Sequence, residues 1–439
     1  MRRQPFRTRA VCYALLVLLP LFTAGCRPRL AYAPTREPVT LRFAYRQRGE
    51  QTQAQLTAEM QPLLDDFHAK YPWITVEAVE MQRWDVQLDL AIKDGTIDTF
   101  LAGREALAYA QQGLLKPLDD IQLGDWASIR SDYLQGTWEA LSIEGQQWGI
   151  PADLDIVVVY VNADRAKALE VSVPDSEWSL FDLMELATKM NYPEGLPYDQ
   201  SSRLFGFCTS PESIDPVIFV YLHGGRIVDD LNSPSEATLT DPLTVEAVEW
   251  YCDLYQRHNV APDPKVIEST FQRGGIYEAQ MREACGTWLG WYSNRRGLET
   301  RYQWSFDCKM LPLPRDKAEL SVGEIEGYFV TDGCTHPSEA LKLLRFLSDR
   351  WEAAGQRLPP RQSLLEDDRY EQAVGKDVAD IARAFSNKVI VMPSEHMPAL
   401  QLVGEELIKA IGRIIAEDLE PADVLAETQE RVRTVFQSP

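Results

Sequence analysis

Residues 148–166, WGIPADLDIVVVYVNADRA, contain the stretch that decides the fold. Within it, residues 156–161 form an unbroken apolar run that is rich in β-branched side chains. Such a run is typical of a strand that is covered on both faces. Strands of this kind occur where helices pack on both sides of a sheet, so the segment predicts an α/β protein.

Expected strands and helices alternate on either side of this run. Further strands are expected at 39–45, 74–81 and 97–102. Helical spacing of apolar residues predicts helices over 56–71, 86–94, 180–190, 242–258, 338–349, 377–385, 400–419 and 421–436. Pro242 suits the first turn of its helix, after a candidate cap at Asp241. Strand–helix–strand alternation predicts α/β layers with largely parallel sheets.

The composition excludes several classes of protein. The chain has 439 residues, 45% of them apolar, and this length is typical of two or three domains. Its formal net charge is −22, whereas a nucleic-acid-binding protein needs a basic face. A polyanionic substrate is disfavoured for the same reason. The sequence shows no repeat period and no low-complexity tract, which argues against a solenoid and against disorder.

The first 26 residues are expected to direct export. Residues 2–9 carry four arginines and no acid, and the apolar run 11–22 is shorter than the ~20 residues that span a bilayer. The run ends in Thr23-Ala24-Gly25-Cys26, which resembles the lipobox of bacterial lipoproteins, although Thr23 stands where Leu is usual. The resemblance implies a signal peptide at 1–25, then a lipidated Cys26 and stalk at 26–38, anchored to the membrane by acyl chains. Simple secretion and an uncleaved anchor are the alternatives.

Five cysteines remain besides Cys12 in the signal and the lipidated Cys26, so at least one of their thiols is unpaired within the chain. They are Cys208, Cys252, Cys285, Cys308 and Cys334. Cys285 and Cys308 border two apolar stretches and are the expected disulfide pair. No Cys-x-x-Cys spacing occurs, and we expect neither a metal site nor a cofactor.

Eight segments in the same order resemble one known family. They are LLDDFHAKYPWITVEAVE, AIKDGTIDTFLAG, QQGLLKPLDDI, WGIPADLDIVVVYVNADRA, VPDSEWSLFDLMELATKM, LHGGRIVDD, LTDPLTVEAVEWYCDLYQ and GGIYEAQMREACGTW. Together they resemble the family 1 extracellular solute-binding proteins of bacterial ABC importers, over nearly all of residues 39–436. Ile97 departs from the pattern, because the family has Pro at this position.

The resemblance implies a two-lobed fold of the periplasmic-binding-protein type. Each lobe would be a mixed, mostly parallel sheet flanked by helices, and two or three crossing strands would join the lobes. Lobe one is expected to comprise residues 39–152 and 324–358, and lobe two residues 153–323 and 359–439. The implied partners are a small solute, most simply a carbohydrate, and the permease subunits of an ABC importer. The protein is expected to act as a monomer, without nucleic acid.

Ligands of open α/β sheets bind at the carboxyl ends of the strands, and this rule selects candidate residues. With those beside the expected crossings, the candidates are Tyr45, Arg46, Gln47, Trp84, Arg104, Glu105, Asp153, Asp155, Glu212, Trp288, Trp291, Tyr328 and Arg361. In the resembling family, the position of Asp155 is often an acid that touches the ligand. The position of Trp288 is often an aromatic residue that stacks on it.

Each candidate also has a structural alternative. Trp288 follows a glycine at an expected strand end, so we expect it to face the ligand rather than the core. Trp288→Ala should then weaken sugar binding about tenfold or more and leave the thermal stability nearly unchanged. Trp178 is expected in the core. For Arg46 and Arg104 the alternative is an ion pair with acidic side chains at the surface. For the acidic candidates it is a position on a solvent-exposed face.

These residue types suit a sugar. An indole covers the apolar C–H face of a sugar ring, while carboxylates and guanidinium groups bind its hydroxyls with directional hydrogen bonds. An amino acid would require paired fixed charges. A peptide and a polyol remain open alternatives.

The sequence contains no catalytic signature. The patterns G-x-S-x-G, H-E-x-x-H, G-x-G-x-x-G and the Walker loop are all absent, and the five histidines are scattered singly. A secreted glycoside hydrolase that uses two of the many acids is the alternative class, and a ligand-sensing surface lipoprotein is another. The expected mechanism is capture by closure, in which the ligand bridges two lobes and shifts the equilibrium towards the closed form.

Overall fold

The computed structural model describes residues 36–46, 53–81, 83–121, 129–191, 204–231, 234–271, 275–299, 302–385, 388–391 and 398–437. The chain divides into two compact units, Met1–Glu37 and Pro38–Pro439, and the second unit contains every helix and strand named below. The expected signal peptide 1–25 and Cys26 lie outside the described residues. Within the described residues, none of the helices combines the length and the apolar character needed to cross a bilayer.

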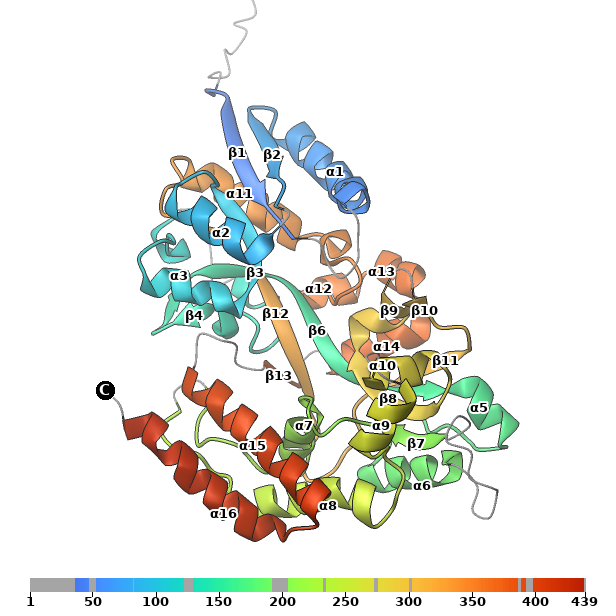
Figure 1. Cartoon of the computed structure of the whole chain (residues 1–439). Coiled ribbons are helices and arrows are strands. Elements are labelled where there is room, and N and C mark those ends of the chain that lie inside the picture. The colour runs from blue at the N-terminus through green and yellow to red at the C-terminus, as the bar shows by residue number, and fades with distance from the viewer. Residues whose placement is uncertain are drawn as a thin grey trace, which may run out of the picture. The chain divides into compact units, whose positions relative to one another are not determined.

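One mixed sheet of nine strands organises the second unit (Figure 1). Its main path runs in the order β2-β1-β3-β12-β6-β8-β7, while β11 pairs with β6 and β13 with β12. Parallel pairing joins β1 to β2 and β3, β7 to β8, and β12 to β13. The bounds are β1 Val39–Ala44, β2 Ile74–Val79, β3 Thr99–Gly103, β6 Gly149–Asn162, β7 Phe205–Cys208, β8 Cys285–Trp291, β11 Cys308–Leu311, β12 Ser321–Val330 and β13 Val389–Val391.

The two longest strands, β6 and β12, cross the molecule and connect the two ends of this sheet. They pair with each other antiparallel, with Gly323 opposite Ile156 and Phe329 opposite Gly149. The carboxyl half of β12 also pairs with β3, and the carboxyl half of β6 with β8. A third segment joins them at Leu358, whose backbone exchanges hydrogen bonds of 2.8 and 3.0 Å with Leu154. The structure therefore contains the crossing strands that the family resemblance implied.

The apolar run at 156–161 lies inside β6, and all of β6 is buried. Successive side chains of a strand point to opposite faces. Accordingly, Val157 and Val159 join one apolar core while Ile156, Val158 and Tyr160 join another. Each such buried side chain contributes roughly 1.5–3 kcal/mol to folding. The interpretation of a strand covered on both faces is confirmed.

Helices flank the sheet on both sides (Figure 1). Their bounds are α1 Gln53–Lys70, α2 Trp84–Lys93, α3 Leu107–Gln111, α5 Ala163–Ala168, α6 Leu180–Met190, α7 Asp215–Leu222, α8 Pro242–Gln256, α9 Pro264–Phe271, α10 Gly275–Met281, α11 Pro337–Ser348, α12 Gln362–Leu365, α13 Asp368–Val374, α14 Lys376–Phe385, α15 Pro398–Glu417 and α16 Pro421–Val432.

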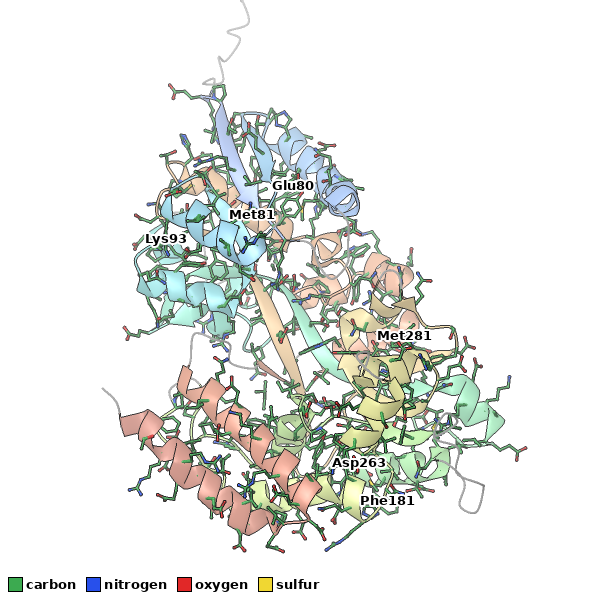
Figure 2. The ribbon with its side chains drawn as sticks, viewed as in Figure 1. Glu80, Met81, Lys93, Phe181, Asp263 and Met281 are labelled. Atoms are coloured by element: carbon green, nitrogen blue, oxygen red, sulfur yellow. A yellow bond between two sulfur atoms is a disulfide. The ribbon has the colours of Figure 1, made fainter. Side chains whose placement is uncertain are left out.

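Helix α6 occupies the residues predicted for it, because a capping box defines its start. The Ser179 hydroxyl accepts a hydrogen bond from the Asp182 backbone, and the Asp182 carboxylate accepts one from the Ser179 backbone. Leu183 and Leu186 are buried, whereas Phe181 points outward and is 75% exposed (Figure 2). The helix thus presents one apolar face to the core.

The expected disulfide between Cys285 and Cys308 is wrong. Cys285 on β8 is bonded to Cys208 on the neighbouring parallel strand β7, with a Cα–Cα distance of 5.5 Å. Cys308 lies on β11, and β6 separates β11 from β8. Two strand spacings amount to about 9.6 Å, beyond the ~7 Å that a disulfide can bridge. Cys252, Cys308 and Cys334 are free thiols, which agrees with the odd number of cysteines.

Candidate ligand-binding site

A cavity of about 110 Å³ lies at the carboxyl ends of β7 and β8. The residues that line it come from β6, from the segment that leads from β7 into α7, from α10, and from the last part of β8 and the turn that follows. Ligands of open α/β sheets bind outside the carboxyl ends of strands. The cavity therefore lies at the edge of the sheet where ligands of this class of fold bind.

Five aromatic side chains line the cavity: Tyr160, Tyr277, Trp288, Trp291 and Trp304. The rings of Tyr160 and Trp288 are stacked with centroids 5.8 Å apart, and Trp304 meets Trp288 edge to face at 5.3 Å. The Tyr160 hydroxyl donates a hydrogen bond of 2.8 Å to the backbone oxygen of Trp291. These contacts fix the rings of Tyr160, Trp288 and Trp304 relative to one another.

Glycine at position 290 allows this arrangement. A Cβ atom at Gly290 would lie 2.9 Å from Cε2 of Tyr160, closer than two carbon atoms can approach. The Tyr160 ring therefore packs directly on the β8 backbone between Leu289 and Trp291, and any larger residue at 290 would displace it.

The expectation that Trp288 avoids the core is wrong. Its side chain is 1% exposed and packs against Tyr160, Trp304 and Phe306. The reason is that β8 continues to Trp291, so Trp288 lies inside the strand rather than at its end. Trp288 thus contributes to the cavity wall and is otherwise a core residue, while the half-buried Trp291 stands at the strand end.

Asp215 places a carboxylate at the cavity. It is the first residue of α7, and its Oδ2 accepts a hydrogen bond of 2.7 Å from the Thr209 hydroxyl. Burial raises the pKa of Asp215 to about 6, although hydrogen bonds from neighbouring hydroxyls act in the opposite direction. Glu212, the candidate expected from the sequence in this region, is exposed instead. The Asp215-Pro216 pair ahead of an apolar run was a detectable signal, because it is typical of a helix start that follows a strand.

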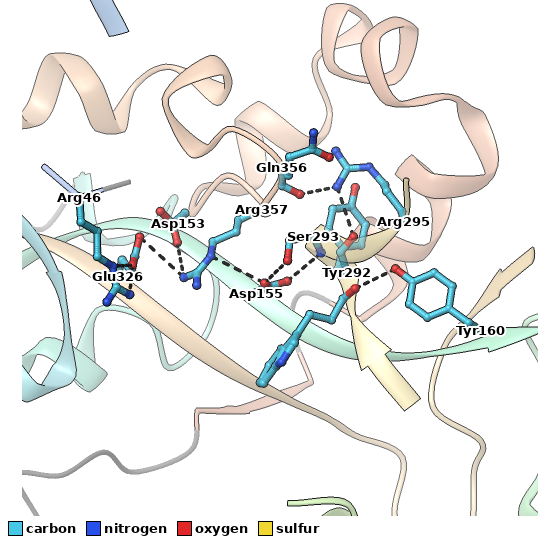
Figure 3. A network of polar contacts seen from close by, with 11 residues as sticks. Arg46, Asp153, Asp155, Tyr160, Tyr292, Ser293, Arg295, Glu326, Gln356 and Arg357 are labelled. Carbon is cyan, nitrogen blue, oxygen red and sulfur yellow. Dashed lines mark hydrogen bonds and ion pairs between the residues drawn. The ribbon is translucent and has the colours of Figure 1, made fainter. Parts of the chain in front are cut away.

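A network of buried charges occupies the crossing strands (Figure 3). Arg357 is its centre, with Nη1 at 3.1 Å from Asp153 and 3.7 Å from Glu326, and Nε at 3.7 Å from Asp155. Arg46, which follows β1, donates from Nε to Glu326 at 3.0 Å. The network therefore joins both crossing strands to the end of β1.

Asp155 extends this network towards the cavity (Figure 3). It accepts hydrogen bonds from the Ser293 backbone at 3.0 Å and from the Ser293 hydroxyl at 2.5 Å. Ser293 is adjacent to Asn294, which lines the cavity. Burial raises the pKa of Asp155, while Arg357 and Ser293 oppose this effect. Arg295 follows Asn294 in the chain, and it donates to the backbone oxygens of Tyr292 and Gln356.

The structure places other candidates away from this site. Tyr45 and Tyr328 are buried in an apolar core, where both pack against Phe43 with ring centroids 5.2 and 6.1 Å apart. Arg361 is held by Asp132 at 2.7 Å and by Asp349. These three side chains therefore have structural partners of their own.

Three further candidates lie near the end of β3 or at the start of α2. Arg104 is buried, not at the surface as its alternative role required, and donates to the Ala140 backbone at 2.9 Å. Burial lowers the pKa of Arg104 to about 10. Glu105 accepts a 3.0 Å hydrogen bond from the backbone of Gly103, and Trp84 is half-buried at the start of α2. Gln47 lies outside the described residues.

Of the predicted candidates, then, the structure gathers Arg46, Asp153 and Asp155 in the charge network and Trp288 and Trp291 at the cavity. Trp178 lies in the core as expected, 2% exposed, and its indole donates to the Pro312 oxygen. Among the described residues, no group of three or more His, Cys, Asp or Glu side chains could hold a metal ion.

Comparison with known proteins identifies similar sequences. The family model described as bacterial extracellular solute-binding protein matches residues 52–350. A Streptomyces antibioticus protein described as an uncharacterized lipoprotein in the oleD 5′ region is 30% identical over 194 residues. That alignment covers 43% of this chain and 40% of the relative, so the chain spans less than half the length of this relative.

Solved structures share the fold at low sequence identity. A cyclo/maltodextrin-binding protein complexed with maltotetraose is 17% identical, with a TM-score of 0.71, covering 92% of this chain and 99% of that one. The sugar-binding protein MalE from Xanthomonas citri is 18% identical, with a TM-score of 0.68 over 91% and 97% of the two chains. The substrate-binding protein Lmo0181 from Listeria monocytogenes, in complex with cycloalternan, is 16% identical, with a TM-score of 0.67 over 92% and 100%.

Proposed function

The chain belongs to the family of bacterial extracellular solute-binding proteins, and on that premise we propose that it captures a carbohydrate for an ABC importer. The observation that carries the proposal is the aromatic cavity at the carboxyl ends of β7 and β8. Indole and phenol rings there can cover the C–H face of a sugar ring. Asp215, Ser213 and Asn294 offer polar groups for its hydroxyls. A small number of polar groups in a mainly apolar wall is typical of a small-molecule site.

The fold neighbours support a carbohydrate as ligand. The cyclo/maltodextrin-binding protein was solved with maltotetraose and the Listeria protein with cycloalternan. At 16–17% identity these matches concern the fold, so the choice of ligand rests on the residues of the cavity itself.

The proposed mechanism is closure of two lobes around the ligand. The lobes would comprise residues 39–152 with 324–358, and residues 153–323 with 359–439, joined by β6, β12 and the segment at Leu358. A ligand that touches both lobes favours the closed form by its differential affinity for that form. The closed form would then deliver the ligand to a permease in the membrane.

We further propose that the protein is a lipoprotein, anchored through Cys26 after removal of residues 1–25. The naming of the Streptomyces relative as a lipoprotein supports this. Labelling of cells with radioactive palmitate should mark the native chain and leave Cys26→Ser unmarked. Equal labelling of both chains would contradict the proposed anchor.

The test of ligand capture is a thermal-shift screen against mono- and oligosaccharides, with polyols, amino acids and short peptides as controls. At about 100 times its dissociation constant, a ligand raises the free energy of unfolding by about 2.7 kcal/mol. One class of sugar should raise the melting temperature, and chromatography should recover it unchanged. A folded protein that responds to no carbohydrate would contradict the proposal, and cleavage of the sugar would favour a hydrolase.

A further inference from the structure

The carboxylate at the cavity has no cationic partner in the described part of the chain. The groups that hold Asp215 are neutral: the hydroxyls of Thr209 and Ser213 and the backbone of Ser210. The cavity lining contains no Lys, Arg or His among the described residues. A carboxylate removed from water without a counter-ion is costly, so a cation at this position would stabilise it.

A second acceptor at the cavity has no hydrogen-bond partner in the described part of the chain. Gln280, on α10, lines the cavity and is 3% exposed, and its Oε1 atom has no hydrogen-bond donor within the described residues. Buried acceptors are nearly always paired in folded proteins. Within the described residues Asp215 thus lacks a cation and Gln280 lacks a donor. Both groups are acceptors, so they suit a ligand group with several N–H donors.

The aromatic side chains of the cavity also favour a cationic ligand group. The face of an indole or phenol ring carries negative potential and attracts ammonium groups. Tyr160, Tyr277, Trp288, Trp291 and Trp304 all contribute to the wall. A cavity of aromatic rings around one carboxylate resembles the aromatic cages that bind organic cations.

The crossing strands beside the cavity add further negative charge. Asp153 is opposite Glu326 and Asp155 is opposite Glu324, so four carboxylates share one face of β6 and β12. Arg357 and Arg46 supply two positive charges to this face, and Glu324 is exposed. Arg295 follows the lining residue Asn294, and its guanidinium donates hydrogen bonds to the backbone oxygens of Tyr292 and Gln356.

We propose that the carbohydrate captured here is an amino sugar, whose ammonium group binds Asp215 inside the aromatic wall. This inference rests on the proposed function and names its substrate class. A neutral hydroxyl would satisfy one hydrogen bond of the carboxylate but would not neutralise its charge. An N-acetylated sugar lacks the charge, and an acidic sugar would be repelled.

The test compares sugars that differ in one substituent. The full chain, purified in detergent, is titrated calorimetrically at pH 7 with glucosamine and glucose, galactosamine and galactose, and the trimer of β-1,4-linked glucosamine and cellotriose. We expect the amino member of at least one pair to bind about tenfold or more tightly than its neutral partner. The N-acetylated trimer should bind as weakly as cellotriose.

The possible outcomes separate the two proposals. Equal or tighter binding of the neutral member in every pair that binds would overturn the amino-sugar inference and leave carbohydrate capture intact. Absence of binding by every member, with the chain folded, would overturn the amino-sugar inference, and the thermal-shift screen would then decide carbohydrate capture separately.

Two matched variants test whether the ammonium group of the sugar binds at Asp215. Asp215→Asn keeps the shape of the side chain and one acceptor oxygen but removes its charge, so the tenfold preference should vanish while the affinity for the neutral sugar stays. Glu212→Gln removes an exposed carboxylate three residues away and should leave the preference unchanged. An intact preference in folded Asp215→Asn would overturn the assignment to Asp215. If that variant does not fold, the comparison of sugars with the wild type still decides the inference.

Discussion

Arg357 illustrates how this protein keeps a charge inside its core. Burial by itself lowers the pKa of Arg357, but the carboxylates of Glu326, Asp153 and Asp155 raise it well above its ordinary value. The guanidinium therefore stays charged, and each of the three carboxylates has a partner in it. The cluster is a single unit, because the loss of one member leaves the others buried without compensation.

Replacing Arg357 should be strongly destabilising. In Arg357→Met, three buried carboxylates lose their shared cation, and we expect the free energy of unfolding to fall by about 3–5 kcal/mol. Urea denaturation followed by tryptophan fluorescence measures this change. The control is Arg369→Met, which removes an exposed ion pair with Asp367 and should leave the midpoint unchanged. Equal effects of the two substitutions would contradict a role for the buried network.

The burial of Trp288 reverses the stability effect that the sequence predicted for Trp288→Ala. Removing a side chain that is 1% exposed should lower the free energy of unfolding by about 3–5 kcal/mol. Trp291→Ala, at the half-buried end of β8, should weaken sugar binding with a smaller loss of stability. Denaturation and calorimetric titration of both variants check this. An unfolding curve of Trp288→Ala that coincides with the wild type would show that the residue is not core.

Asp215 should make the stability of the protein depend on pH. Its pKa is about 6 in the folded chain and 3.8 without the fold, so the folded state holds its proton more tightly between these values. The free energy of unfolding should therefore fall as pH rises from 4 to 6. The loss is at most about 3 kcal/mol, and solvent reduces it because Asp215 is only half-buried. Denaturation of the wild type and Asp215→Asn between pH 4 and 7 should show a weaker decline in the variant, and parallel curves would refute this.

Among the elements, β7 and β8 are joined by the Cys208–Cys285 bond, which links residues 77 positions apart. These two strands carry the loop with Asp215 and the strand end with Trp291, so their registration shapes the cavity. A covalent link of this span restricts the unfolded chain far more than the folded one.

Removing the disulfide should therefore destabilise the protein. For the double substitution Cys208→Ala with Cys285→Ala, we expect a loss of about 2–5 kcal/mol in the free energy of unfolding. Thermal denaturation compares it with Cys308→Ala, which removes a free thiol and breaks no cross-link. A double variant no less stable than this control would contradict the expected contribution.

At the scale of the whole molecule, β6 and β12 connect the two lobes that are proposed to move against each other. Arg46 at the end of β1 and Ser293 after β8 both contact the charges on the crossing strands. Movement of one lobe against the other would thus bend β6 and β12, whose charged side chains contact Arg46 in one lobe and Ser293 in the other. Hinges of this kind concentrate the change in backbone dihedral angles at a few residues.

The proposed ligand should make the molecule more compact. Small-angle scattering should show a smaller radius of gyration at saturating sugar, because the ligand favours the closed form. Tryptophan fluorescence should change in parallel, since Trp288, Trp291 and Trp304 line the cavity. A polyol that does not bind is the control. Saturation without any change in scattering would contradict closure.

Much of the fold was predictable because its signals are local. The apolar run at 156–161, the Ser179 cap and Pro242 each act within a few residues, and the structure has a strand or a helix boundary at each. Apolar periodicity does not report how far a strand extends. The strand end expected at Trp288 was therefore wrong, and β8 continues to Trp291.

The sequence by itself determined the fold class, the family resemblance and the regions in which a ligand site would form. Only the tertiary structure decided which residues become partners. It places Asp215 rather than Glu212 at the cavity and Cys208 rather than Cys308 beside Cys285. It also places Arg357 among three carboxylates. Periodicity and capping depend on neighbours along the chain. Partnerships across the sheet depend on strand order and register, which bring together residues that are far apart in the sequence.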